Sequence, residues 1–287
     1  LSARDLLIES KIALHENMSP FAIQAVDSED VNQWAKTIRE ELELSIDVQY
    51  GCQSTRQFYL YVRNAVERAG VFVHCFTGIE TEIVRGFAIY EDFLPIIGLN
   101  NEDRYPAKTF TIFHELEHLM KRSSAVCNDM ISHDLAQHEE VFCNAVAGEI
   151  LVPKLNLIRQ LGSLTTDEID LNLISKLAAK FSVSKEVISR RLLDIGKISK
   201  SQYSALTDAI RISFENEREA IRISRKNSGV KIPRNISREA IDQNSPSLCR
   251  TFYNGFREGY FDKQDVARYL GIKQQHVDKF MREVSRW

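Results

Sequence analysis

The chain has 287 residues, of which 44% are hydrophobic and 27% are charged. These proportions exclude a disordered chain, a collagen and a disulfide scaffold, and the length favours two domains or one large domain with an appendage. The net charge of −3 hides an uneven distribution: residues 1–162 carry 14 basic and 24 acidic side chains, whereas residues 163–287 carry 23 and 16. An acidic half (net −10) therefore precedes a basic half (net +7), which indicates two separate roles.

The five cysteines are widely spaced and contain no C-x-x-C pair, so the sequence predicts neither a disulfide framework nor a cysteine zinc ribbon. We therefore expect a cytoplasmic protein. No segment approaches the ~18 consecutive apolar residues of a membrane span, so we expect no membrane contact. The chain begins at Leu1 rather than Met, which leaves open whether a further domain precedes it.

The predicted elements change character along the chain. Residues 1–66 are predicted to be mainly helical, with Ser28 as a helix cap. Short β-branched and aromatic runs then predict a sheet of about three strands, and two helical segments follow, the second stopped by Pro153. The runs are 70–76, 83–90 and 94–99, and the helical segments are 109–121 and 139–151. This order predicts an α+β domain.

Everything after Pro153 has a helical pattern, interrupted by a polar connection over residues 224–233. We therefore predict three parts: an α+β domain over residues 1–160, a helical domain over 161–225 and a second helical domain over 226–287. Each helical domain is expected to contain one helix-turn-helix-like unit.

The strongest chemical signal is the run His114-Glu115-Leu116-Glu117-His118. On a helix, positions i and i+4 lie one turn apart on the same face, so both imidazoles can bind one zinc ion while Glu115 lies beside the water that the metal activates. A catalytic zinc normally has three protein ligands and one open position. A third ligand is therefore expected downstream.

Five residues are candidates for the third ligand: His133, Asp134, His138, Glu139 and Glu140. Glu140 is favoured, because Asn144 follows one helical turn later on the same face and would hydrogen-bond a ligating histidine. Glu139 and His138 remain alternatives. Cys143 adjoins this segment, where a thiol is typical of a small buried core residue.

The run from Arg104 to His118 and the run Glu140-Val-Phe-Cys-Asn144-Ala-Val-Ala-Gly-Glu-Ile-Leu-Val-Pro153 resemble the ImmA/IrrE family of zinc metallopeptidases. The resemblance covers roughly residues 55–155. It implies a zincin-like catalytic domain in which His114, His118 and Glu140 bind Zn²⁺ and Glu115 is the general base. Phe113 and Glu117 stand where that family usually has small residues.

The resemblance also implies a substrate class. Proteins of this family typically cleave a regulatory protein, often a helix-turn-helix repressor of a mobile element, a toxin–antitoxin pair or a stress regulon. The rival hypothesis is a transcriptional regulator or protein-binding module, in which the zinc site is structural or sensory and no peptide bond is cut. The basic residues 163–287 are the reason to keep this rival.

Two further features of a peptidase site are expected. A side chain that stabilises the oxyanion is needed, and Tyr105, His133 and His138 are candidates. The strand predicted at 83–90 could present a free edge to an extended peptide substrate.

Residues 174–191 fit a helix-turn-helix, with Ser182 and Val183 in the turn. Lys185, Ser189, Arg190 and Arg191 are then expected to face outward, as contacts with DNA or a partner would require. The segment 266–277 has the same spacing, with Gly271 in its turn. The alternative is that both units are helical hairpins that pack on the catalytic domain or form a homodimer.

Overall fold

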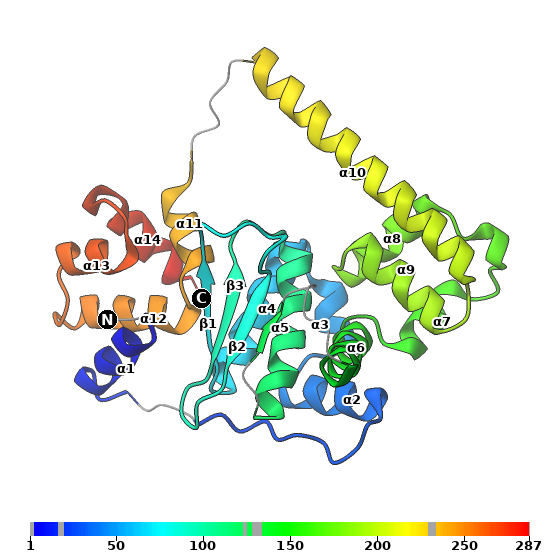
Figure 1. The fold of residues 1–287 in the computed structure, drawn as a ribbon. Coiled ribbons are helices and arrows are strands. Elements are labelled where there is room, and N and C mark those ends of the chain that lie inside the picture. The colour runs from blue at the N-terminus through cyan, green and yellow to red at the C-terminus, as the bar shows by residue number, and fades with distance from the viewer. Residues whose placement is uncertain (1–2, 17–19, 123–124, 128–133, 229–233, 287) are drawn as a thin grey trace.

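The structure is a computed structural model that describes residues 3–16, 20–122, 125–127, 134–228 and 234–286. A small sheet lies at the centre, and the helices of the C-terminal half lie on both sides of it (Figure 1). The α+β class predicted from the sequence is confirmed.

The sheet has four strands in the order β1-β3-β2-β4. They are β1 (Phe72–Phe76), β2 (Gly86–Ile89), β3 (Ile96–Asn100) and β4 (Ala125–Cys127). β1 is parallel to β3, and β2 is antiparallel to both of its neighbours. β4 is not predicted from the sequence, because three residues are too few to show a strand period. The predicted free edge at 83–90 is wrong, since β2 is paired on both sides.

Four helices precede the sheet: α1 (Ala3–Ala13), α2 (Val31–Glu41), α3 (Ile46–Gly51) and α4 (Thr55–Arg68). The last three begin at side-chain caps, in which Asp30, Ser45 and Ser54 accept a hydrogen bond from a backbone N–H of the first turn. The predicted cap Ser28 lies two residues before the true cap and instead accepts a hydrogen bond from the backbone N–H of Asp30.

Two long helices carry the candidate site. α5 (Tyr105–Met120) packs on β2 and β3, and α6 (Asp134–Leu151) packs against α5 (Figure 1). Pro106 lies in the first turn of α5, where its fixed φ favours a helix and its missing N–H costs nothing. Every residue from Lys108 to Met120 except Phe110 is buried, so α5 is a core helix with neighbours on all sides.

Gly86 of β2 allows α5 to approach the sheet closely. A Cβ atom at this position would lie 2.3 Å from Thr111 Cγ2, 3.0 Å from Gly98 O and 3.1 Å from Glu115 Oε1. Any larger residue must therefore displace α5 at the turn that carries Glu115.

We expect Gly86→Ala to lower the free energy of unfolding by about 1–3 kcal/mol, the usual cost of overpacking a tight contact. Gly51→Ala is the control, because a Cβ atom there meets nothing within 4 Å. It should change the stability by less than about 0.5 kcal/mol. Urea unfolding measures both, and equal stabilities of the two variants would contradict the close approach.

The main core continues beyond the predicted boundary at residue 160. α7 (Lys154–Leu161), a 3₁₀ turn (Thr166–Glu168), α8 (Leu171–Phe181) and α9 (Lys185–Asp194) follow α6. Apolar side chains of α8 and α9 share one buried cluster with those of the sheet and of α2 to α7. Gln49 joins these parts, because its Nε2 donates to both Leu151 O and Phe181 O at 2.8 Å. The first helix-turn-helix unit is therefore packed against the α+β core.

The long helix α10 (Lys200–Ser228) leads away from this core, and α11 (Ile236–Gln243) lies beside β1 (Figure 1). α12 (Pro246–Arg257), α13 (Lys263–Leu270), a 3₁₀ turn (Gln274–His276) and α14 (Val277–Val284) complete the chain. They form a second core together with Leu7 of α1 and with Phe72, Leu94 and Ile96 at the sheet. The C-terminal helices and the N-terminal helix therefore make one structural unit.

No single helix of the described residues is long and apolar enough to cross a membrane. Residues 138–151 of α6 and the helix α7 meet those criteria only as a pair, bent by 54°. Both helices bury apolar side chains in the main core.

Candidate metal centre

α5 presents two histidines to α6. His114 and His118 lie one turn apart on the same face, with ring centroids 5.2 Å apart and side chains that are almost fully buried. The sequence predicts this arrangement because the i, i+4 spacing fixes it wherever the segment is helical. The Nε2 atoms of both rings face the same carboxylate on α6.

That carboxylate belongs to Glu140. Its Oε2 lies 3.1 Å from His114 Nε2, and its Oε1 lies 3.4 Å from His118 Nε2. The two adjacent imidazoles lower the pKa of Glu140 to about 2, so it is a carboxylate at neutral pH. Two imidazole nitrogens and one carboxylate thus converge from two helices.

Asn144 orients His114. The Oδ1 atom of Asn144 lies 3.0 Å from His114 Nδ1, and because an amide oxygen only accepts, Nδ1 carries the proton and donates. The lone pair of His114 is then on Nε2, which is buried and has no hydrogen-bond partner among the described residues. A metal ligand needs this tautomer.

The three donors fit a metal ion. A tetrahedral zinc with ligands at about 2.0–2.2 Å separates its nitrogen and oxygen donors by about 3.3–3.5 Å. The two observed nitrogen–oxygen separations, 3.1 and 3.4 Å, are close to this requirement. The donor types, two imidazoles and one carboxylate, are also those of catalytic zinc sites.

Glu115 lies between the two histidines and is fully buried. Its side chain lies against β2 at Gly86, where a Cβ atom would be only 3.1 Å from Glu115 Oε1. The close approach of α5 to the sheet therefore holds this carboxylate between the helix and β2.

The other predicted third ligands are placed differently. Glu139 Oε1 lies 3.8 Å from His118 Nδ1 and 3.8 Å from Lys121 Nζ, on the side of the ring away from Glu140. His138 is exposed. His133 lies outside the described residues, and so does the side chain of Asp134.

The expectation that Tyr105 stabilises an oxyanion is wrong. Tyr105 begins α5, and nine residues of helix, about 13 Å, separate it from His114. Its hydroxyl donates to Asp242 Oδ2 at 2.8 Å. Of the other two candidates, His138 is exposed at the start of α6, and His133 again lies outside the described residues.

The predicted outward direction of Ser189 and Arg191 is also wrong. Ser189 is buried, and its hydroxyl donates to Lys185 O within α9. Arg191 is buried in an ion pair with Glu149 of α6, and its Nε donates to Val152 O. Arg190 is exposed but pairs with Asp194 at 2.9 Å. The local sequence of α9 does not indicate which of its faces is covered, because the helix that covers it, α6, belongs to another part of the chain.

Sequence reasoning missed two polar groups. One lies beside the histidines, where buried Glu117 pairs with Lys121 at 2.6 Å and accepts a hydrogen bond from Cys143. The other joins α11 to the catalytic fold and includes Asp242. Glu117 was detectable as an acidic residue in an otherwise apolar helix, whereas nothing in the local sequence around Asp242 indicates its partners.

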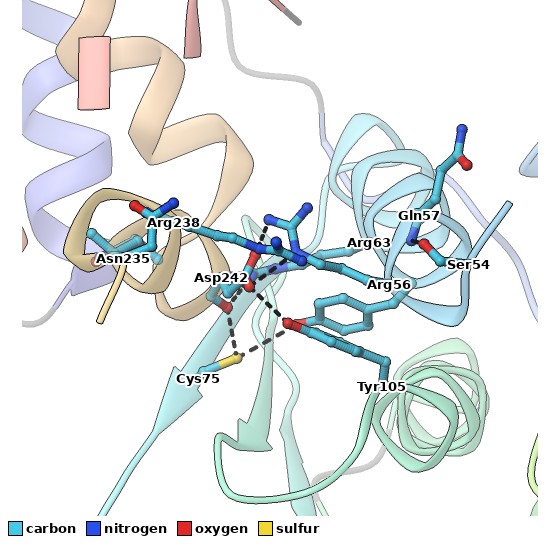
Figure 2. A network of polar contacts seen from close by, with 12 residues as sticks. Ser54, Arg56, Gln57, Arg63, Cys75, Tyr105, Asn235, Arg238 and Asp242 are labelled. Atoms are coloured by element: carbon cyan, nitrogen blue, oxygen red, sulfur yellow. Dashed lines mark hydrogen bonds and ion pairs between the residues drawn. The ribbon is translucent and has the colours of Figure 1, made fainter. Parts of the chain in front are cut away.

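Figure 2 shows the second group, in which Asp242 is the centre. Its carboxylate accepts from Arg56 Nη2 at 2.5 Å, from Arg56 Nε at 3.1 Å and from the hydroxyl of Tyr105. Its backbone carbonyl accepts from Arg63 Nη1 at 2.8 Å, and Arg63 Nη2 donates to Val73 O. Burial and the hydrogen bond to Asp242 raise the pKa of Tyr105. The network therefore links α11 to α4, α5 and β1.

Residues 66–193 match the family model Peptidase_M78, described as the IrrE N-terminal-like domain. These residues are a Peptidase_M78 domain. Peptidase_M78 is a metallopeptidase family, and the match includes α5, α6 and the buried group His114, His118 and Cys143, whose candidate ligand atoms lie within 4.8 Å of one another. No curated protein matches the chain. The M78 match ends at the end of α9, which agrees with the packing of α8 and α9 on the catalytic core.

Proposed function

We propose that this chain is a zinc-dependent endopeptidase whose metal is held by His114, His118 and Glu140. One observation carries this proposal: two buried imidazole nitrogens on α5 face one carboxylate on α6, within a Peptidase_M78 domain. Zinc is proposed over other divalent ions because imidazole and carboxylate donors in this number are typical of catalytic zinc.

The residues of the site have distinct roles in this proposal. A zinc ion with one open position polarises a peptide carbonyl and lowers the pKa of water to ~7. Glu115 accepts the proton of the attacking water at its carboxylate and delivers it to the leaving amine. Asn144 keeps His114 Nδ1 protonated, so that Nε2 remains a ligand.

The metal content of the purified protein tests the proposed ligands. We expect about one equivalent of zinc per chain, and less than about half an equivalent in His114→Ala, because one of three protein ligands is lost. His15→Asn is the matched control, since His15 is exposed and its positive φ of 52° suits asparagine. Equal zinc content in all three proteins would rule out the metal centre at His114.

We propose a helix-turn-helix repressor as the substrate and the cytoplasm as the place of action. The support is the resemblance of residues 55–155 to the ImmA/IrrE family, whose members typically cleave such regulators. The substrate is then a folded or partly folded protein rather than a small peptide.

DNA contact by the C-terminal unit is the second candidate function. Gly271 follows α13 in the left-handed conformation. Lys273, Gln274 and Gln275 come next and are exposed, in and before the 3₁₀ turn that leads into α14. This is the position from which a helix-turn-helix contacts bases and phosphates. In the first unit, two of the four residues predicted to face outward, Ser189 and Arg191, are buried.

A mobility shift with the full chain tests this second function. We expect DNA binding that weakens steeply as salt rises, and further weakening by Lys273→Glu. Lys36→Glu on α2 is the control, since Lys36 is exposed in the acidic half. The absence of a shift at low salt would mean that α13 and α14 pack within the fold and do not bind DNA.

A further inference from the structure

Cys143 lies at the metal centre rather than beside it. It follows Glu140 by three residues on α6, and its side chain is completely buried. Its Sγ lies 3.6 Å from His118 Nε2, the atom that also faces Glu140 Oε1 at 3.4 Å. Candidate ligand atoms of His114, His118 and Cys143 lie within 4.8 Å of one another.

The separation of 3.6 Å is the one that a shared metal ion requires. Zinc binds sulfur at about 2.3 Å and imidazole nitrogen at about 2.0–2.1 Å, so tetrahedral geometry places these two donors about 3.5–3.6 Å apart. The sulfur therefore has the correct distance from His118 for a ligand, as the Glu140 oxygens have from the two imidazoles.

The surroundings of Cys143 also differ from those of a cysteine that only fills space. Its thiol donates to Glu117, which is itself buried and held by Lys121 at 2.6 Å. Cys249 is equally buried, but it lies among the apolar side chains of the second core. Cys143 is therefore held beside the histidines by a polar contact rather than by apolar packing alone.

We propose that Cys143 is a fourth protein ligand of the metal held by His114, His118 and Glu140. The inference rests on the proposed metal centre. Binding would form a sulfur–metal bond and break the S–H bond, and the proton would be released to water. No redox change is involved.

This ligand set has a consequence for activity. A zinc ion with four protein ligands has no open position, as in structural sites, whereas a catalytic ion keeps one position for water or substrate. Cys143 and the water activated for attack therefore compete for the same position. The thiolate must leave before peptide cleavage, so the thiol keeps the resting site closed.

Cobalt substitution of the full chain tests the proposal without any substrate. Metal-free protein is loaded with Co²⁺, and the near-ultraviolet absorption is recorded for the wild type, Cys143→Ser, Cys143→Ala and the control Cys249→Ala. We expect a thiolate-to-cobalt charge-transfer band in the wild type and in Cys249→Ala, and its loss in both Cys143 variants. Zinc affinity, measured by competition with a chelating dye, should fall by at least about tenfold in the Cys143 variants, since even loss of an outer hydrogen bond costs that much.

The outcomes separate this inference from the proposed function. Bound cobalt with visible d–d bands but no thiolate band in the wild type would overturn the role of Cys143 and leave the metal centre intact. A thiolate band that persists in Cys143→Ala would overturn it as well. Failure of the wild type to bind cobalt or zinc would overturn both proposals. Circular dichroism confirms that each variant is folded, and the two replacements at Cys143 guard against a packing defect in either one.

Discussion

Glu115→Gln is expected to abolish proteolysis while the metal stays bound. A glutamine has almost the same size and fits between α5 and β2, where Glu115 is fully buried beside Gly86. It cannot accept the proton of the attacking water, and loss of a general base typically slows a reaction by about 10²–10⁴-fold. His114, His118 and Glu140 are unchanged, so zinc content should remain at about one equivalent per chain.

The measurement is co-expression of the chain with candidate helix-turn-helix repressors, followed by mass spectrometry of the partner. Glu41→Gln is the control, because Glu41 is exposed on α2. Cleavage should continue in the control and stop in Glu115→Gln. If regulation in cells is unchanged by Glu115→Gln, the regulator without proteolysis becomes the better description.

Asp242→Asn is expected to lower the free energy of unfolding by about 3 kcal/mol. Asp242 is almost buried and neutralises Arg56 through two hydrogen bonds, while it also accepts from the Tyr105 hydroxyl. An amide has one acceptor oxygen and no charge, so the Arg56 guanidinium, whose side chain is 22% exposed, loses its charged partner. Removal of one partner of a buried pair usually costs about 3–5 kcal/mol.

Glu239→Gln provides a control on the same helix. Glu239 pairs with Arg234, whose side chain is 73% exposed, and exposed pairs contribute about 0–1 kcal/mol. Urea unfolding of both variants measures the difference. Similar losses in the two variants would show that the network of Figure 2 does not hold α11 against the catalytic fold.

Local patterns were sufficient for the elements that carry the chemistry. The apolar period and the i, i+4 histidines predicted a core helix at 109–121, and α5 covers it. The three longer strands were predicted because β-branched and aromatic runs lie between turn residues. The shortest strand was missed because pairing with β2, rather than its own sequence, makes it a strand.

Packing of distant segments was not predictable in the same way. The outward-facing interpretation of α9 failed at Arg191, because its partner Glu149 lies on α6. Tyr105 does not take the predicted oxyanion role, because its hydroxyl binds Asp242, 137 residues later in the chain. In both cases the polar partner is far away in sequence. The local pattern of polar and apolar residues therefore cannot indicate it.

The sequence by itself determined the chemistry of this protein: two histidines and a glutamate at helical spacing, with a further acidic residue and an amide one turn apart downstream. Helix geometry alone fixes those relations, since residues i and i+4 always share a face. Only the tertiary structure decided that Glu140 and Cys143 face the same histidine, that the first helix-turn-helix unit packs against α6, and that α11 is held against β1. These depend on contacts between separate elements, which form when apolar faces are buried together and polar groups must find partners within the fold.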